Sequence, residues 1–167
     1  PTNPLLTVVD IAAVAAVAGR TGARLVVDNT FATPYLQRPL AHGADIVVHS
    51  TTKYLGGHSD VVGGFVATND SEVHDHLAFI QNAVGALPAP WDCYLTLRGG
   101  KTLRLRMDRE NANAAAVVDL LHGHASIPVR PGRDLARLIE VAAFQTKLKM
   151  SGYNPAKELN DRLISQM

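Results

Sequence analysis

The sequence predicts an α/β domain in which helices cover both faces of a mainly parallel sheet. Short, continuous apolar runs at 24–28, 45–50 and 61–68 are typical of buried strands. Segments with apolar residues at helical spacing lie around them, at 10–22, 71–86 and about 99–122. Open sheets usually contain more than these three strands, so the pattern indicates an incomplete domain.

Local signals set the expected bounds of these elements. Asp10 and Ser71 are candidate N-caps of the first two helices, because a side-chain oxygen there can accept a backbone N–H. Pro34 and Pro39 keep the segment after the first strand from forming a long helix. Paired glycines, Gly63–Gly64, predict a close backbone approach at the start of the third strand. The last helix is expected to bury a stripe of apolar side chains: Leu103, Met107, Ala114, Val117 and Leu121.

Composition excludes several classes of protein. The 167 residues are 47% hydrophobic, which allows a sizeable core. With 16 basic and 15 acidic residues the net charge is +1, so neither nucleic acid nor an anionic membrane is an expected partner. No run reaches the roughly 18 apolar residues of a membrane span. The single cysteine, Cys93, excludes an internal disulfide and fits a reducing, cytoplasmic compartment, and we expect it to be a small buried hydrophobe.

Polar residues follow two of the predicted strands. Asp28 ends the first strand, and Ser50 ends the second, with Thr52 and Lys53 just beyond it. Ligands of parallel α/β sheets bind at the carboxyl ends of strands, so these four side chains are expected to converge.

Their chemistry matches one cofactor in particular. A lysine amine can form a Schiff base with an aldehyde, hydroxyls can donate to phosphate, and a carboxylate can pair with a protonated ring nitrogen. Pyridoxal phosphate has all three of these groups. Spacing alone leaves the alternatives open, because Lys53 could equally be a surface side chain and Asp28 a turn former. No spacing of the histidines is typical of a metal site.

Three longer motifs give a resemblance to a known family. They are "TNPLLTVVDI", "VVDNTFATPYLQRPLAHGADIVVHSTTKYLGGHSDVVGG" and "WDCYLTLRGGKTLRLRM", and they extend from Pro1 to about His124. In this order they resemble the Cys/Met-metabolism family of pyridoxal-phosphate enzymes, which includes cystathionine γ-synthase and γ-lyase. The resemblance implies residues 1–124 to be the C-terminal part of a fold-type-I large domain and residues 125–167 to be a helical tail outside the family pattern.

The resemblance also implies a role for each site residue. Lys53 would hold pyridoxal phosphate covalently and shuttle protons on the substrate, and Asp28 would pair with the pyridine nitrogen. Ser50 and Thr52 would bind the phosphate. Asn3, in the "NP" element, would lie near the ring oxygen and the substrate carboxylate.

Two functions are compatible with this sequence. The first is a transsulfuration enzyme of methionine biosynthesis and cysteine metabolism, most like cystathionine γ-synthase, with γ-elimination of the cystathionine γ-lyase or methionine γ-lyase type as an alternative. Its partners would be small amino-acid substrates and copies of itself, as a dimer of dimers. The second is a non-catalytic paralogue that only associates with a relative. It is motivated by Pro1, which stands where an initiator methionine is expected, and by the unmatched tail.

Overall fold

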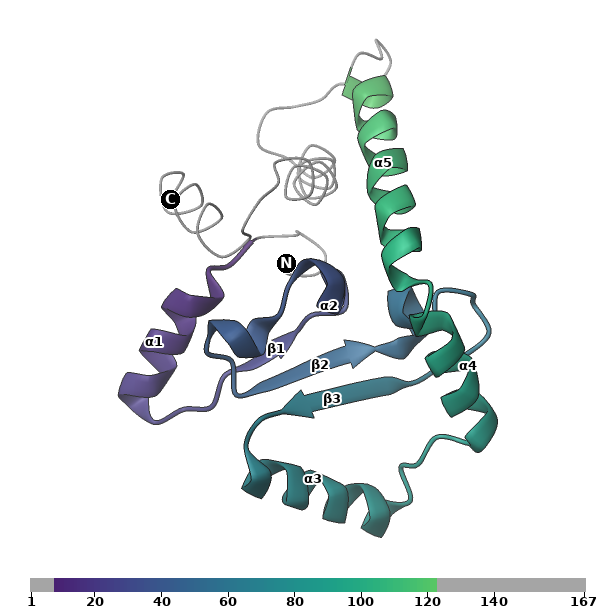
Figure 1. Cartoon of the computed structure of the whole chain (residues 1–167). Coiled ribbons are helices and arrows are strands. Elements are labelled where there is room, and N and C mark those ends of the chain that lie inside the picture. The colour runs from purple at the N-terminus through teal and green to yellow at the C-terminus, as the bar shows by residue number, and fades with distance from the viewer. Residues whose placement is uncertain (1–7, 123–167) are drawn as a thin grey trace. The chain divides into compact units, whose positions relative to one another are not determined.

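The sheet contains three strands in the order β1–β2–β3 (Figure 1). They are β1 (Val26–Asp28), β2 (Ile46–Ser50) and β3 (Gly64–Thr68), seen in a computed structural model that describes residues 8–122 of the chain. Each lies within a run that the sequence predicted to be a strand. β1 pairs with β2 in parallel, whereas β2 pairs with β3 antiparallel, with Ser50 opposite Gly64. The α/β class is confirmed, but the described sheet is mixed rather than mainly parallel.

The direction of β3 follows from its connection to β2. A parallel return requires a crossover of a dozen or more residues, usually a helix that covers one face of the sheet. Residues 51–63 instead form a loop that starts with a π-type turn, η2 (Thr51–Leu55), and stays at the edge where β2 ends. The chain therefore re-enters the sheet from the same edge. Apolar runs mark strands but not their direction, so the antiparallel pairing of β3 could not be predicted from them.

Three short helical elements flank β1 along the chain. α1 (Ile11–Thr21) confirms the first predicted helix, and α2 (Thr33–Leu36) and the 3-10 helix η1 (Pro39–His42) occupy the proline-containing segment. Asn29 is buried and exchanges two hydrogen bonds of 2.9 Å with Gln37, from its amide to the Gln37 carbonyl oxygen and from the Gln37 amide to its own oxygen. This pair closes the segment that follows β1.

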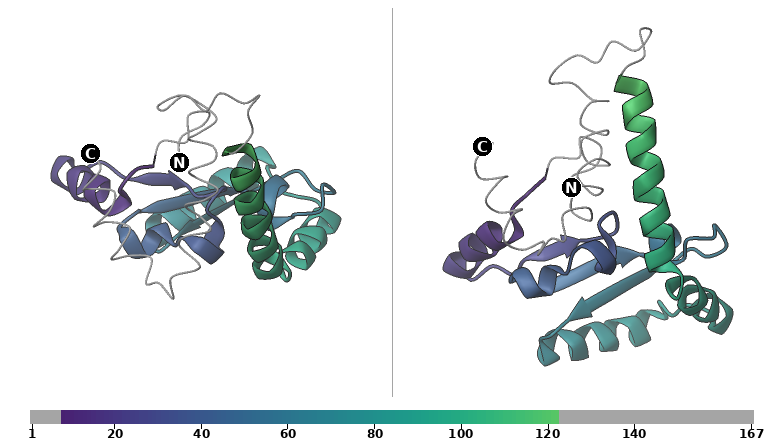
Figure 2. Two further views of the ribbon diagram at one scale, coloured as in Figure 1. Left: turned by 90° about the horizontal axis from the view of Figure 1, so that it is seen from above. Right: turned by 45° about the horizontal axis from the view of Figure 1, so that its top comes forward.

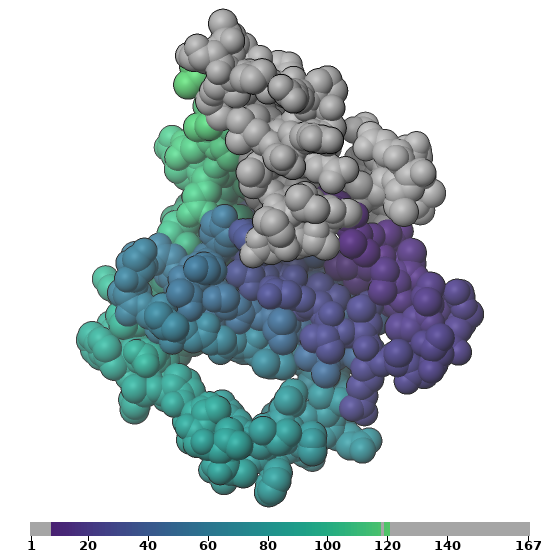
Figure 3. All heavy atoms as spheres, turned by 180° about the vertical axis from the view of Figure 1, so that it is seen from behind, coloured from purple at the N-terminus to yellow at the C-terminus, as the bar shows by residue number. Residues whose placement is uncertain are grey.

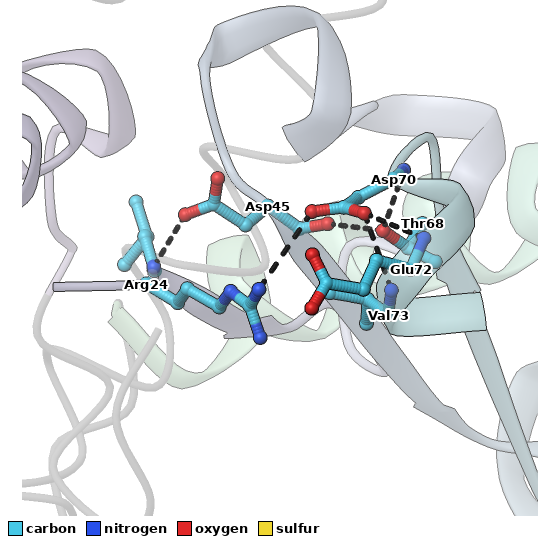
Figure 4. A network of polar contacts seen from close by, with 7 residues as sticks. Arg24, Asp45, Thr68, Asp70, Glu72 and Val73 are labelled. Carbon is cyan, nitrogen blue, oxygen red and sulfur yellow. Dashed lines mark hydrogen bonds and ion pairs between the residues drawn. The ribbon is translucent and has the colours of Figure 1, made fainter. Parts of the chain in front are cut away.

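A polar network joins the opposite end of the sheet to α3 (Ser71–Val84) (Figure 4). The Thr68 hydroxyl donates to the Asp45 carbonyl oxygen at 2.8 Å and accepts from the Asp70 N–H at 3.1 Å. Asp70 in turn accepts from the backbone of Glu72 and Val73. Asp70, and not Ser71, is therefore the N-cap. Its carboxylate reaches the free N–H groups of the first turn while Ser71 already lies inside the helix.

The segment after α3 forms two helices where the sequence predicted one. α4 (Pro90–Gly100) precedes α5 (Leu103–His122), so the expected helix from about 99 begins later and a helix was missed (Figure 2). Pro90 lies in the first turn of α4, a position where proline is favoured. Leu103 and Met107 are buried as predicted, but Val117 is 52% exposed.

Residues 11–104 form one compact unit that contains the sheet, and the other described residues, 8–10 and 105–122, belong to a second unit. The core of the first unit includes Val47, Val61 and Val73. Phe65 and Val66 of β3 are 52% and 46% exposed, so the expected cover on both faces is not found there. In the space-filling view α3 and α4 surround an opening beside the sheet (Figure 3).

Candidate functional site

The predicted site lies on the loop between β2 and β3. Within η2 the backbone of Lys53 leaves the helical region, with φ −95° and ψ −126°, which turns its exposed side chain out of the turn. The Gly57 N–H donates to the Lys53 carbonyl oxygen at 2.7 Å, and the Gly56 N–H donates to that of Thr51 at 2.9 Å. Gly57 has a φ of +70°, a conformation that costs glycine little. The two glycines thus close the turn around the lysine.

Gly63 fixes the other side of this loop. Its carbonyl oxygen accepts from the Thr51 N–H at 2.9 Å, and its N–H donates to the Thr52 hydroxyl oxygen at 3.0 Å. A Cβ on Gly63 would lie 2.7 Å from the Thr51 hydroxyl oxygen, whereas one on Gly64 would meet the His49 carbonyl oxygen only at 3.7 Å. The predicted close approach is therefore made by Gly63 alone.

The Thr52 hydroxyl group can donate its proton to a ligand. Its hydroxyl lies 3.4 Å from the Gly63 carbonyl oxygen, a long and weak hydrogen bond. A phosphate oxygen could take that proton without disturbing the stronger bond from the Gly63 N–H.

Asp28 and Ser50 are joined through a residue that sequence reasoning missed. The Thr30 N–H donates to an Asp28 carboxylate oxygen at 2.9 Å, and the Thr30 hydroxyl oxygen accepts from the Ser50 N–H at 2.8 Å. The carboxyl ends of β1 and β2 are thereby held side by side. An aspartate often accepts from the backbone N–H two residues on, so the Asp28–Thr30 turn had a local signal, whereas the bond from Ser50 to Thr30 had none.

A pocket of about 860 Å³ opens beside Lys53. Thr52 and Lys53 line it, so the structure brings these two predicted residues together. Asp28 and Ser50 do not line it, but Phe31, the neighbour of Thr30, does. Two carboxylates also face this space: Asp60 from the same loop and Asp92, a residue of α4 that the sequence analysis did not single out. Asn3 lies outside the described residues.

His49 belongs to the opposite face of the sheet. It is buried, with 6% of its surface exposed, and it lines a separate cavity of about 1290 Å³ together with Val47 and Phe65. Burial lowers the pKa of His49 below its usual range, and the negative charge of Asp28 partly opposes this. His49 is therefore neutral at pH 7.

The residues at the strand ends fit pyridoxal phosphate. The Lys53 amine is exposed at a pocket, the Asp28 carboxylate stands at a strand end, and Thr52 can still donate its hydroxyl proton. These are the three kinds of group that the aldehyde, the ring nitrogen and the phosphate require.

The described residues contain neither a metal cluster nor a membrane-spanning helix. Among residues 8–122 no three His, Cys, Asp or Glu side chains gather closely enough to hold a metal ion. No helix within that range combines the length and apolar character needed to cross a membrane. Cys93 is exposed, contrary to the prediction that it is buried, and the large hydrophobic side chains of Trp91 and Tyr94 on the same helix are exposed as well.

Solved structures show which class of protein has this fold. A crystal structure of metB from Corynebacterium glutamicum superposes with a TM-score of 0.76 and 52% identity, covering 87% of this chain and 38% of that one. A cystathionine gamma-synthase from Xanthomonas oryzae, solved with aminoacrylate and cysteine, superposes with a TM-score of 0.69 and 52% identity. It covers 75% of this chain and 32% of that one. The described chain is thus an α/β fragment with the fold of cystathionine synthases and lyases.

The family follows from the sequence comparisons. Residues 1–130 match the family described as Cys/Met metabolism PLP-dependent enzyme. Cystathionine gamma-synthase of Mycobacterium tuberculosis is 54% identical over 144 residues, which is 81% of this chain and 37% of the relative. Cystathionine gamma-lyase of Dictyostelium discoideum is 50% identical over 155 residues, 92% of this chain and 39% of the relative. The chain belongs to the Cys/Met-metabolism family of pyridoxal-phosphate-dependent enzymes, and it spans less than half the length of these relatives.

Proposed function

We propose that the chain supplies the lysine-bearing part of the pyridoxal-phosphate site of a transsulfuration enzyme. The observation that carries this proposal is Lys53, exposed at a pocket and held by Gly57 and Gly63, next to the Asp28–Thr30–Ser50 link. Family membership supports the identity of the cofactor.

Each side chain has a proposed task at this site. When bound, pyridoxal phosphate supplies a ring that accepts electrons from the substrate. Lys53 holds the cofactor and then carries a proton between Cα and Cβ of the substrate, which allows a group to leave from Cγ. Asp28 keeps the ring nitrogen protonated by its charge, and Ser50 and Thr52 hold the phosphate. Asn3 is proposed to lie near the substrate carboxylate.

The proposed reaction is γ-replacement, in which cysteine displaces the acyl group of an O-acyl-homoserine. It is supported by relatives named cystathionine gamma-synthase. Relatives named cystathionine gamma-lyase are almost as similar, so γ-elimination is the alternative. A non-catalytic role as an association partner is the third reading, motivated by the share of the relatives that the chain covers.

Cofactor binding tests the proposal first. The purified chain, mixed with pyridoxal phosphate, is expected to gain the visible absorbance of an imine, and Lys53→Ala is expected to lose it. Lys101→Ala is a matched control, because it removes another lysine of the same compact unit. Absence of the absorbance from the unaltered chain would leave the non-catalytic reading.

Product analysis then separates the reactions. Cystathionine formed from O-acyl-homoserine and cysteine supports the synthase, whereas release of cysteine from cystathionine supports the lyase. We also propose that the protein is cytoplasmic and that it assembles as a dimer of dimers. In this proposal the family domain ends at residue 124 and a helical tail follows it. Gel filtration at several chain concentrations tests the assembly.

A further inference from the structure

Helix α4 touches the lysine loop at a contact between two glycines. A Cβ built on Gly99 would overlap the Gly56 carbonyl oxygen and would lie 3.1 Å from the Gly56 Cα. Both glycines are buried. Figures 1 and 2 both show α4 beside this loop. No side chain, not even a methyl group, fits between the helix and the loop at this point.

Gly56 is the residue on which the conformation of the loop depends. Its N–H donates to the Thr51 carbonyl oxygen, and its own carbonyl oxygen lies 2.7 Å from His58 Nδ1. A carbonyl can only accept, so this ring nitrogen carries the proton and donates it. A Cβ on Gly56 would also lie 2.5 Å from the Thr51 carbonyl oxygen and 2.8 Å from a Val61 methyl carbon. Gly56 is thus enclosed on every side, and displacing it displaces the turn that carries Lys53.

We propose that α4 positions Lys53 through this contact, and that Gly99 is a positioning residue of the lysine site. The proposal rests on the proposed function of Lys53 as the cofactor lysine. Gly99 is not among the residues that line the pocket beside Lys53, so its proposed action passes through Gly56 and the turn. The same helix supplies Asp92 to that pocket, which places both ends of α4 against the site.

The neighbouring glycine provides a matched control. Gly100 lies in the same helix, and a Cβ there would meet no atom within 4 Å. Gly99→Ala and Gly100→Ala therefore make the same chemical change one residue apart, and both raise helix propensity. Only the first forces the helix away from the loop. A shift of even a few tenths of an ångström in a closely packed backbone contact is costly.

The test uses pyridoxal phosphate as the probe. For the unaltered chain and Gly100→Ala we expect the same dissociation constant and the same midpoint pH of the imine absorbance. For Gly99→Ala we expect binding weakened by about tenfold or more and a shifted midpoint. A merely destabilised chain would lose amplitude without a shift of the midpoint. Equal dissociation constants and midpoints in the two variants would overturn the proposal.

Two further measurements keep the outcomes distinct. If the unaltered chain binds no cofactor, the proposed function fails, and acetylation of Lys53 in the cofactor-free chain still tests the positioning. Its rate should change in Gly99→Ala and not in Gly100→Ala. If the Gly99→Ala variant does not fold, hydrogen exchange of the backbone amides in the unaltered chain tests the contact instead. The Gly56 and Gly57 amides should then open together with the last turn of α4, and independent opening would refute the contact as a positioning device.

Discussion

Thr30 offers the sharpest test of how the two strand ends are held together. Its hydroxyl oxygen accepts from the part-buried N–H of Ser50 at 2.8 Å. Thr30→Val keeps the shape of the side chain but removes that acceptor. Leaving a buried N–H without a partner costs about 1–3 kcal/mol, and partial burial places the expected loss of unfolding free energy at about 1–2 kcal/mol.

The matched variant is Thr30→Ser, which keeps the oxygen and deletes only a methyl group. Urea unfolding followed by circular dichroism should give a loss below about 1 kcal/mol for this variant, and a clearly larger one for Thr30→Val. Binding of pyridoxal phosphate should follow the same order, because Asp28 and Ser50 flank the link. Equal unfolding free energies for the two variants would refute the reasoning, since the hydroxyl would then contribute nothing.

Three other predictions concern the cap, the pH dependence and the second glycine contact. Asp70→Ala should cost about 1 kcal/mol in urea unfolding while Asp70→Asn stays within about 0.5 kcal/mol, because asparagine also caps a helix. As the pH falls below about 6.5, the unfolding free energy should drop, by at most about 1.4 kcal/mol per pH unit, because unfolded His49 takes up a proton that the buried ring resists. Gly63→Ala should cost about 1–3 kcal/mol and Gly64→Ala less than about 1 kcal/mol, because only the first meets the Thr51 hydroxyl.

Each of these has an outcome that contradicts it. Equal losses of unfolding free energy for the two Asp70 variants would mean that the charge of Asp70 matters and its capping does not. A large effect of the charge is not expected, because the ion pair with Arg24 is exposed and 3.9 Å long. Replacing His49 by glutamine should remove the fall in stability at low pH, and replacing the exposed His74 should not. If the unfolding free energy still falls at low pH in the His49 variant, other titratable groups cause the fall. Tolerance of alanine at Gly63 would mean that the loop can move.

Much of the fold could be predicted because its strands are unbroken β-branched runs. "RLVVD" and "DIVVHS" have no competing helical spacing, and polar residues mark where each strand ends. The direction of β3 depends instead on the path of the loop 51–63, which Gly63 holds by hydrogen bonds to Thr51 and Thr52 and which no local pattern predicts. α4 was missed because a proline can either stop a helix or lie in its first turn, and Pro90 does the second.

The candidate site was likewise only partly predictable from the sequence. Lys53, Asp28, Ser50 and Thr52 could be singled out because each carries its own chemistry at a strand end. The contact between Gly56 and Gly99 could not be predicted, since it is recognised only when two distant segments meet. The exposure of Cys93 likewise depends on which face α4 presents, and a short helix of weak amphipathic character does not predict its own orientation.

Mapping the trapped cofactor tests the central claim most directly. The chain is incubated with pyridoxal phosphate, reduced with borohydride and digested, and the peptides are sequenced by mass spectrometry. A pyridoxyl group on Lys53, absent from the Lys53→Ala variant and not spread over Lys101 and the other lysines, is the predicted result. A label distributed evenly over the lysines, or none at all, would contradict the assignment of Lys53 as the cofactor lysine.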